Sequence, residues 1–168
     1  MTKRTYESDA IRVFWDSERC IHTGFCLQTE PDVFDVGRRP WIDVDAAEAD
    51  AVAAAIEQCP TGALRYERLD GRPGEQSPPE TVMIPWPNGP LIVKGTARVE
   101  TRRGEVFARE HRLALCRCGA SNNQPFCDNS HREVGFRDNP KVVADERQAA
   151  ASPSDVGPKQ QTGPPAEA

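Results

Sequence analysis

Apolar residues in the first seventy positions form two short extended runs on either side of one helical run. Ile11 to Trp15 and Ala63 to Tyr66 are rich in β-branched, aromatic and aliphatic side chains, so each run predicts a β-strand. The alanine-rich segment Ala46 to Gln58 predicts a helix, because alanine has the highest helix propensity. Asp45 and Glu48 have the spacing of a capping box, so we expect Asp45 to be the N-cap of this helix.

The other parts of this region are polar or end at turn-forming residues. Residues 1–9 are polar, and we expect them to be loosely ordered. Leu27 to Glu30 predicts a short helix that ends before Pro31, since a residue before proline disfavours helical backbone. The first seventy residues therefore predict a small unit of strands and helices.

After residue 80 the chain is made of short apolar runs and of segments in which small or apolar residues alternate with polar ones. Alternation of this kind is typical of half-buried strands. The predicted strands are Val82–Ile84, Leu91–Val93, Ala97–Thr101, Val106–Glu110 and Arg112–Leu115. The last strand leads directly into Cys116, so a small antiparallel β-rich unit is expected to support whatever follows it.

Two stretches lack the apolar residues that a folded core needs. Residues 71–80 are rich in proline, glycine and polar side chains, and we predict that they form a linker too short and too proline-rich to swing freely. Near the C-terminus there are too few apolar side chains for their burial to offset the conformational entropy that folding would cost. The predicted organisation is an α+β chain with an α/β unit at 8–70, a linker at 71–80, a β-rich unit at 81–140 and a disordered tail at 141–168.

Acidic charge is concentrated in the first half of the chain. Residues 1–75 hold nine basic and fifteen acidic side chains, whereas residues 76–140 hold nine and seven. No basic stripe is present, which argues against nucleic acid as a partner. No apolar run is long enough for a transmembrane helix, and the first ten residues lack the apolar centre of a secretory leader. We therefore expect a cytoplasmic protein with no membrane partner.

Cysteine supplies the candidate chemistry. Six cysteines without an export signal are more typical of metal ligands than of disulfides. They form two groups of three, namely Cys20, Cys26 and Cys59, and Cys116, Cys118 and Cys127. His131 follows the second group in the spacing C-x-C-x8-C-x3-H, and lies four positions after Cys127, on the same face of a helical turn. Thiolate and imidazole donors of this kind bind a transition metal or an iron–sulfur cluster.

The second group resembles the CDGSH iron–sulfur domain, whose pattern is C-x-C-x2-[ST]-x3-P-x-C-D-G-[STA]-H. Further residues that match are Ser121, Pro125, Asp128 and Ser130. Asn129 stands where the family has glycine, and asparagine tolerates the left-handed backbone conformation better than other residues with a side chain. The resemblance implies a [2Fe–2S] cluster held by Cys116, Cys118, Cys127 and His131.

Zinc is the alternative metal, because the same four donors suit it equally well. In that case the protein would be a zinc-binding interaction module without redox activity. The length and specificity of the motif favour an iron–sulfur cluster. The colour of the purified protein distinguishes the two, since iron–sulfur proteins are red-brown and zinc proteins are colourless.

The first group has the layout Cys20-x5-Cys26, followed after the predicted helix by Cys59-Pro60. Bacterial-type ferredoxins use C-x2-C-x2-C with a distant Cys-Pro. Residues 11–68 resemble a divergent single-cluster version of that domain, with strand, cluster loop, helix and Cys-Pro in the same order. The resemblance implies a small ferredoxin-like α/β unit that holds a cluster on Cys20, Cys26 and Cys59.

The middle cysteine of the ferredoxin pattern is replaced by Thr23. Three thiolates alone suit a [3Fe–4S] cluster, whereas a [4Fe–4S] cluster needs a fourth donor, for which His22, Thr23 and water are open. His22 lies one position before the ordinary site, and the interpretation that we favour for it is an exposed loop histidine. The cluster type stays open at this stage.

Nothing in the sequence predicts a substrate-converting site, because no phosphate-binding glycine loop and no nucleophile motif is present. Two predicted clusters indicate a one-electron carrier rather than an enzyme, with redox sensing or cluster donation as additional roles. We expect a redox partner protein, and the acidic first half would favour a basic one. CDGSH-like domains can pair, so a homodimer is compatible with the resemblance.

His131 gives the second site a specific property. A neutral imidazole in place of a thiolate leaves the cluster less negative and raises its reduction potential. Because imidazole must be deprotonated to bind iron, we predict that this cluster is lost more readily as pH falls. Asp128 and Ser130 are candidates for hydrogen bonds that tune the potential, or for turn and cap interactions.

Overall fold

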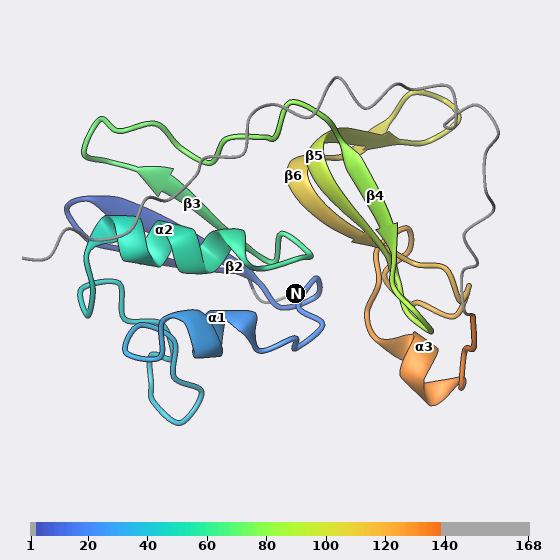
Figure 1. Cartoon of the computed structure of the whole chain (residues 1–168), viewed down its shortest axis with the longest axis horizontal. Coiled ribbons are helices and arrows are strands. Elements are labelled where there is room, and N and C mark those ends of the chain that lie inside the picture. Colours follow the sequence, from blue (N-terminus) through green and yellow to red (C-terminus); the bar gives the residue numbers. More distant parts are fainter. Residues whose placement is uncertain (1–2, 139–168) are drawn as a thin grey trace, which may run out of the picture.

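The computed structural model describes residues 3–138, which form two units side by side (Figure 1). The first unit contains the strands β1 (Lys3–Glu7), β2 (Ile11–Asp16) and β3 (Leu64–Arg68), which form an antiparallel sheet in the order β1-β2-β3. Its helices are α1 (Phe25–Thr29) and α2 (Ala49–Glu57), and α2 packs against β3. The predicted disordered tail at 141–168 lies outside the described residues.

The second unit is a second antiparallel sheet followed by a loop and a short helix. Its strands β4 (Val82–Pro85), β5 (Leu91–Glu100) and β6 (Val106–Leu115) lie in the order β4-β5-β6. The helix α3 (Ser130–Glu133) follows the loop after β6. The described chain is therefore a pair of small β-rich units with few helical residues. Among the described residues, no helix is both long enough and apolar enough to cross a membrane.

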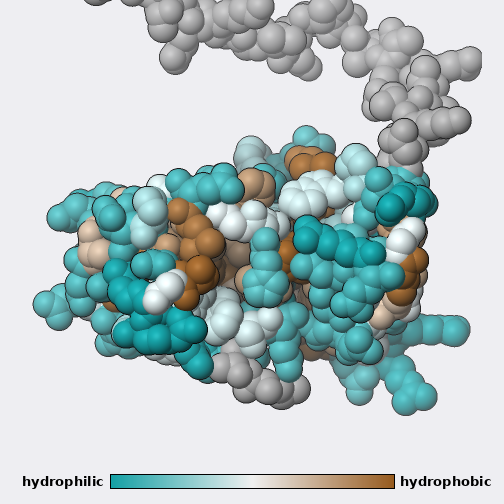
Figure 2. Space-filling model, turned by 90° about the horizontal axis from the view of Figure 1, so that it is seen from below, coloured by the Kyte–Doolittle hydropathy of each residue, from teal (hydrophilic) through white to brown (hydrophobic). Residues whose placement is uncertain are grey.

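Each unit has its own small core. In the first unit Val52 and Ile56 project from one face of α2 and are fully buried, as their spacing in the sequence predicts. Burying such a side chain contributes roughly 1.5–3 kcal/mol. Trp15 and Trp41 pack edge to face beside this core, with ring centroids 5.1 Å apart. The face seen from below in Figure 2 is largely hydrophilic with small separate apolar patches.

Two predictions about the first unit are wrong. Residues 1–9 are not loosely ordered throughout, because β1 pairs with β2 through backbone hydrogen bonds that its polar, exposed side chains do not disturb. The long helix begins at Ala49 rather than after Asp45, with Glu48 as its N-cap. Asp43 is the reason, since its carboxylate accepts from the N–H of Asp45 and its carbonyl from the N–H of Ala46, each at 3.3 Å, which closes a separate turn.

The strands of the second unit are longer than the sequence pattern predicts. Leu91–Val93 and Ala97–Thr101 are parts of one strand, β5, whose register shifts between Lys94 and Ala97. Gly95 lies at that shift with φ 123°, and a Cβ there would come within 2.7 Å of Thr81 Cα. The glycine thus marks an irregularity within a strand rather than the end of one. The two strands predicted at 106–115 likewise form the single strand β6.

Buried arginines join the two units. Arg112 on β6 donates to the carbonyl oxygens of Ile56, Cys59 and Leu64 in the first unit, at 2.6, 2.5 and 3.0 Å. It also pairs with Glu75, in the segment between β3 and β4, at 2.6 Å. From the other side, Arg19 donates to Glu110 on β6 at 2.7 Å. The two units are therefore held together by charged and polar groups that are themselves withdrawn from water.

Candidate metal centres

The loop after β6 folds back on the end of that strand. The backbone N–H of Cys116 donates to the carbonyl oxygen of Pro125 at 2.9 Å, and the N–H of Cys127 donates to that of Ala114 at 2.8 Å. Leu115 and Phe126 also form an isolated antiparallel bridge. These contacts bring Cys127 back beside the strand end that carries Cys116, so residues eleven positions apart meet at one place.

The four candidate donors of this loop form two close pairs. The sulfur atoms of Cys116 and Cys118 are 3.7 Å apart, and Cys127 Sγ lies 3.4 Å from His131 Nδ1. His131 belongs to α3 and Cys127 lies just before it, so the four-residue spacing places both donors on one side of the turn, as predicted. Within residues 3–138, no three Cys, His, Asp or Glu side chains converge closely enough to hold a single metal ion.

The turn that carries the second pair is fixed by Asp128 and Asn129. Asp128 accepts from the Ser130 hydroxyl at 2.7 Å, from the Ser130 N–H at 3.0 Å and from the Asn122 N–H at 2.8 Å. Burial opposes ionisation of this carboxyl, but the hydrogen bonds outweigh it and lower the pKa of Asp128 to about 2. Asn129 adopts φ 78°, as expected for an asparagine at a glycine position, and its N–H points to Cys127 Sγ at 3.5 Å.

The pKa values of the donors follow from their burial and from one another's proximity. Burial raises the pKa of the Cys127 thiol. A hydrogen bond from the Asn129 backbone lowers it, whereas the nearby Cys116, Asp128 and Cys118 raise it further. For Cys116, hydrogen bonds from the Ser121 backbone and from Cys118 outweigh burial and lower the pKa. Burial also lowers the pKa of His131, which favours the neutral imidazole that binds metals.

The three cysteines of the first unit line one cavity of about 440 Å³. Cys20 follows the turn after β2, Cys26 lies in α1 and Cys59 follows α2, so three separate elements converge on this space. Its volume far exceeds the roughly 30 Å³ that one water molecule occupies. The cavity therefore has room for a group of several atoms with thiol donors on its wall.

The pKa values of these thiols reflect a shared, partly buried site. Burial raises the pKa of Cys26 to about 11, and the neighbouring Cys59 and Cys20 add to the effect. Burial likewise raises the pKa of Cys20. Both thiols are protonated at neutral pH without a metal, so metal binding must release their protons.

His22 lies at the edge of the same cavity. Its side chain is exposed, as expected for a loop histidine, yet its Nδ1 is 3.7 Å from Cys20 Sγ. Its backbone has φ 53°, an uncommon conformation for a residue with a side chain. Thr23 also lines the cavity. The structure thus places both protein side chains proposed as a fourth donor, His22 and Thr23, on the wall of the cavity that the three cysteines line.

Sequence reasoning missed Arg112, which donates to the carbonyl oxygen of Cys59. One signal was present. Arg112 opens an otherwise apolar run at the end of β6, and its side chain points inward, where a charged residue needs a specific partner. The partner itself lies fifty-three residues away, and no local pattern identifies it.

Comparison with known proteins is consistent with this geometry. The family described as "Divergent 4Fe-4S mono-cluster" matches residues 6–69, and the family described as "Iron-binding zinc finger CDGSH type" matches residues 88–132. The "Uncharacterized protein YjdI" of Escherichia coli strain K12 is 35% identical over 63 residues, which cover 38% of this chain and 83% of that protein. The protein of the same name from Escherichia coli O157:H7 matches equally.

The chain belongs to the divergent 4Fe–4S mono-cluster family and carries a CDGSH-type region behind it. Both resemblances seen in the sequence are thereby confirmed, in the predicted order. Within this iron–sulfur protein, the mono-cluster match spans Cys20, Cys26 and Cys59, and the CDGSH-type match spans the four donors of the second unit. The first donor set surrounds a cavity with room for several atoms, and the second forms two close pairs. Both sets are rich in thiols, which are the donors that iron–sulfur clusters take.

Proposed function

We propose that this protein is a one-electron carrier with two iron–sulfur clusters, one in each unit. The observation that carries the proposal is the arrangement of Cys116 with Cys118 and of Cys127 with His131 as two separate pairs, at 3.7 and 3.4 Å. Each iron of a [2Fe–2S] cluster takes two protein donors, so two pairs suit two irons. Four donors for one zinc ion would instead surround a single point.

The second cluster is assigned to Cys20, Cys26 and Cys59. We propose His22 as its fourth ligand, because His22 Nδ1 is 3.7 Å from Cys20 Sγ and the residue lines the cavity with the three thiols. Four donors favour [4Fe–4S], whereas three thiolates alone favour [3Fe–4S]. His22→Ala is therefore expected to shift the EPR signature of this site to [3Fe–4S], and Thr23→Ala is expected to leave it unchanged. A [4Fe–4S] signal that persists in His22→Ala would contradict the assignment.

When bound, the clusters supply reversible one-electron oxidation and reduction. The protein side chains hold and shield them. Cys127 and His131 are almost wholly buried, and Cys59 nearly so, which limits access of water and oxygen to the iron-binding atoms. Asn129 directs its backbone N–H at Cys127 Sγ, and such hydrogen bonds to sulfur raise a cluster potential. A one-electron carrier in turn requires a donor and an acceptor protein, for which the acidic first half favours basic surfaces.

The decisive experiment is anaerobic purification with iron, sulfide and zinc counts and EPR before and after reduction by dithionite. Two serine variants separate the sites. Cys59→Ser is expected to lose the signal of the first unit only, and Cys127→Ser the [2Fe–2S] signal only. A colourless protein that contains zinc and no sulfide would overturn the proposal in favour of a zinc-binding interaction module.

A further inference from the structure

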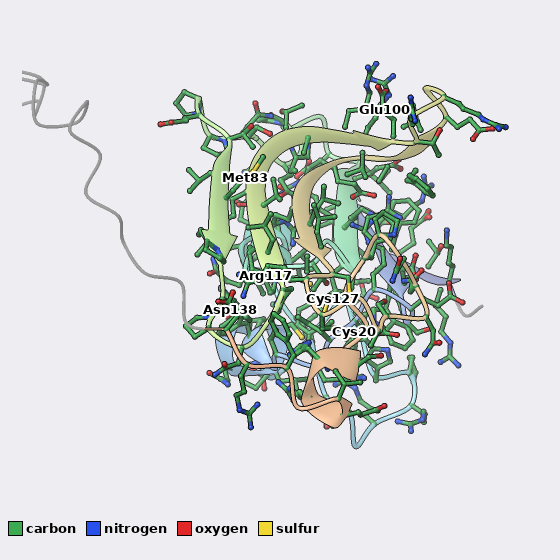
Figure 3. All side chains as sticks on the ribbon, turned by 90° about the vertical axis from the view of Figure 1, so that its right-hand side faces the viewer. Cys20, Met83, Glu100, Arg117, Cys127 and Asp138 are labelled. Carbon is green, nitrogen blue, oxygen red and sulfur yellow. The ribbon has the colours of Figure 1, made fainter. Side chains whose placement is uncertain are left out.

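The loop that carries Cys20 is packed against the second unit. Ile21, the next residue, is only 3% exposed and belongs to the same buried cluster as Ile92, Ala114 and Cys127. In the view of Figure 3, Cys20 and Cys127 both lie near the lower ends of the strands. The side chain next to a proposed ligand of one centre therefore lies in the same buried cluster as a proposed ligand of the other.

Asn129 adds a direct hydrogen bond between the two ligand loops. Its side-chain Nδ2 donates to the carbonyl oxygen of Ile21 at 2.8 Å. This is the position at which the CDGSH pattern has glycine, which has no side chain with which to make such a bond. The backbone of Asn129 keeps the left-handed conformation that a glycine would take, with φ 78°. The asparagine thus preserves the turn and adds a contact to the other unit.

Neighbouring contacts join the same two loops. Asn123 Nδ2 donates to the carbonyl oxygen of Glu18 at 3.0 Å. The guanidinium of Arg19 lies over the ring of Phe126, 4.7 Å from its centroid. The segment before Cys20 is therefore held along the loop that leads to Cys127, and Asn129 completes this contact on the far side of Cys20.

The space around the two centres is divided by one stretch of chain. Ile21 and Thr23 line the cavity that contains the three cysteines of the first unit. They also line a second cavity of about 270 Å³, whose wall includes Asn129 and His131. The segment Ile21 to Thr23 thus borders both spaces, and Asn129 holds the start of that segment.

We propose that Asn129 is a positioning residue that fixes the two ligand loops against each other, so that the two centres exchange electrons within one chain. This inference rests on the proposed function, since it needs both clusters. The exchange is a simple one. One centre is oxidised by one electron and the other is reduced by the same electron, while no proton or atom is transferred. An external one-electron reductant, dithionite in the test below, supplies the first electron.

The test compares Asn129→Gly and Asn129→Asp with the wild type. The glycine variant keeps the left-handed turn and the N–H that points at Cys127, and removes only the side-chain donor. The aspartate variant keeps the size of the side chain and replaces its donor with an acceptor. In the fully reduced wild type we expect magnetic broadening of the EPR signals of both centres by their mutual interaction. Both variants are expected to lose this broadening while their iron and sulfide contents stay at the wild-type level.

Asn88→Gly is the matched control, because Asn88 is another left-handed asparagine whose hydrogen bond, from the Asp138 N–H at 2.9 Å, stays within the second unit. It is expected to keep the broadening. Hydrogen exchange at the amide of His22 gives a second readout that needs no cluster, and both Asn129 variants should accelerate it. Two full clusters without broadening in the wild type, or broadening and exchange rates unchanged in Asn129→Gly, overturn this inference alone. A wild type that lacks either cluster overturns the proposed function as well.

Discussion

Gly62 and Asn129 both adopt left-handed backbone conformations close to a proposed ligand, but for different reasons. Asn129 tolerates φ 78° and uses its side chain to reach Ile21. Gly62, with φ 64°, has no room for a side chain, because a Cβ there would lie 2.5 Å from the carbonyl oxygen of Arg112. Gly62 therefore permits the close approach of β6 to the turn after Cys59.

Gly62→Ala should be clearly destabilising, and Gly71→Ala much less so. Both positions have positive φ, which costs alanine about 1–2 kcal/mol relative to glycine. Only at Gly62 must the new Cβ also displace a backbone carbonyl, whereas nothing lies within 4 Å at Gly71. In urea denaturation we expect Gly62→Ala to lose about 1–3 kcal/mol more unfolding free energy than Gly71→Ala. This difference is in the range found for overpacked sites. Equal losses in the two variants would contradict the close approach.

His131 predicts how the proposed [2Fe–2S] site responds to pH. Burial lowers its pKa, so near neutral pH the imidazole is in the neutral form that binds iron. As pH falls below the ordinary histidine range of about 6.5, protonation competes with iron for the same nitrogen. We expect the visible absorbance of this cluster to decay faster as pH is lowered from 7 to about 5 in the wild type. His131→Cys should decay with a weaker pH dependence over that interval, and parallel pH profiles would refute the role of the imidazole.

Among the elements, β6 does most to connect the two units. Its inward-facing Arg112 has a side chain only 6% exposed and forms five hydrogen bonds, to Glu75 and to three carbonyl oxygens of the first unit. Glu110 on the same strand accepts from Arg19 and Arg65. A strand of the second unit thus fixes the end of α2 and the start of β3, between which Cys59 lies.

Replacing Arg112 with alanine should destabilise the whole described fold. The substitution leaves Glu75, whose side chain is 12% exposed, without its partner, and removes the donors of buried carbonyl groups. Breaking a buried ion pair in this way costs about 3–5 kcal/mol. Arg98→Ala is the matched control, because its pair with Glu100 is largely exposed and is worth about 0–1 kcal/mol. Guanidinium denaturation measures both, and similar unfolding midpoints for the two variants would refute the role of Arg112.

The sequence predicts those features of the elements that depend on neighbouring residues. Cys127 and His131 lie on one side of a turn because their spacing requires it, and Val52 and Ile56 face the core for the same reason. The pairing of β1 with β2 and the late start of α2 were missed, because each depends on backbone hydrogen bonds that no side-chain pattern records. Contacts such as that of Asn129 with Ile21 join residues 108 positions apart, and only the folded chain reveals them.

At the scale of the whole molecule, two small cores and two donor sets depend on one another. Domains of this size bury little apolar surface, so metal centres usually supply part of their stability. The ligand loops of the two units share the buried cluster of Ile21 and Cys127, and Arg112 reaches the carbonyl oxygen beside the Cys59 side chain. Loss of one centre should therefore weaken the packing around the other.

Removal of iron is the corresponding test. We expect the chain with both clusters to unfold in a single transition, followed by circular dichroism and by visible absorbance, because a polar network and shared packing join the units. Chelation of the iron should lower the melting temperature by roughly 10 °C or more, since each kcal/mol shifts it by about 4–8 °C in domains of this size. Cys59→Ser, which retains only the CDGSH-type centre, should melt at an intermediate temperature and also bleach that centre at a lower temperature than the wild type. Bleaching at an unchanged temperature in Cys59→Ser would mean that the two units are energetically independent, and that the contacts between their ligand loops do not couple their stability.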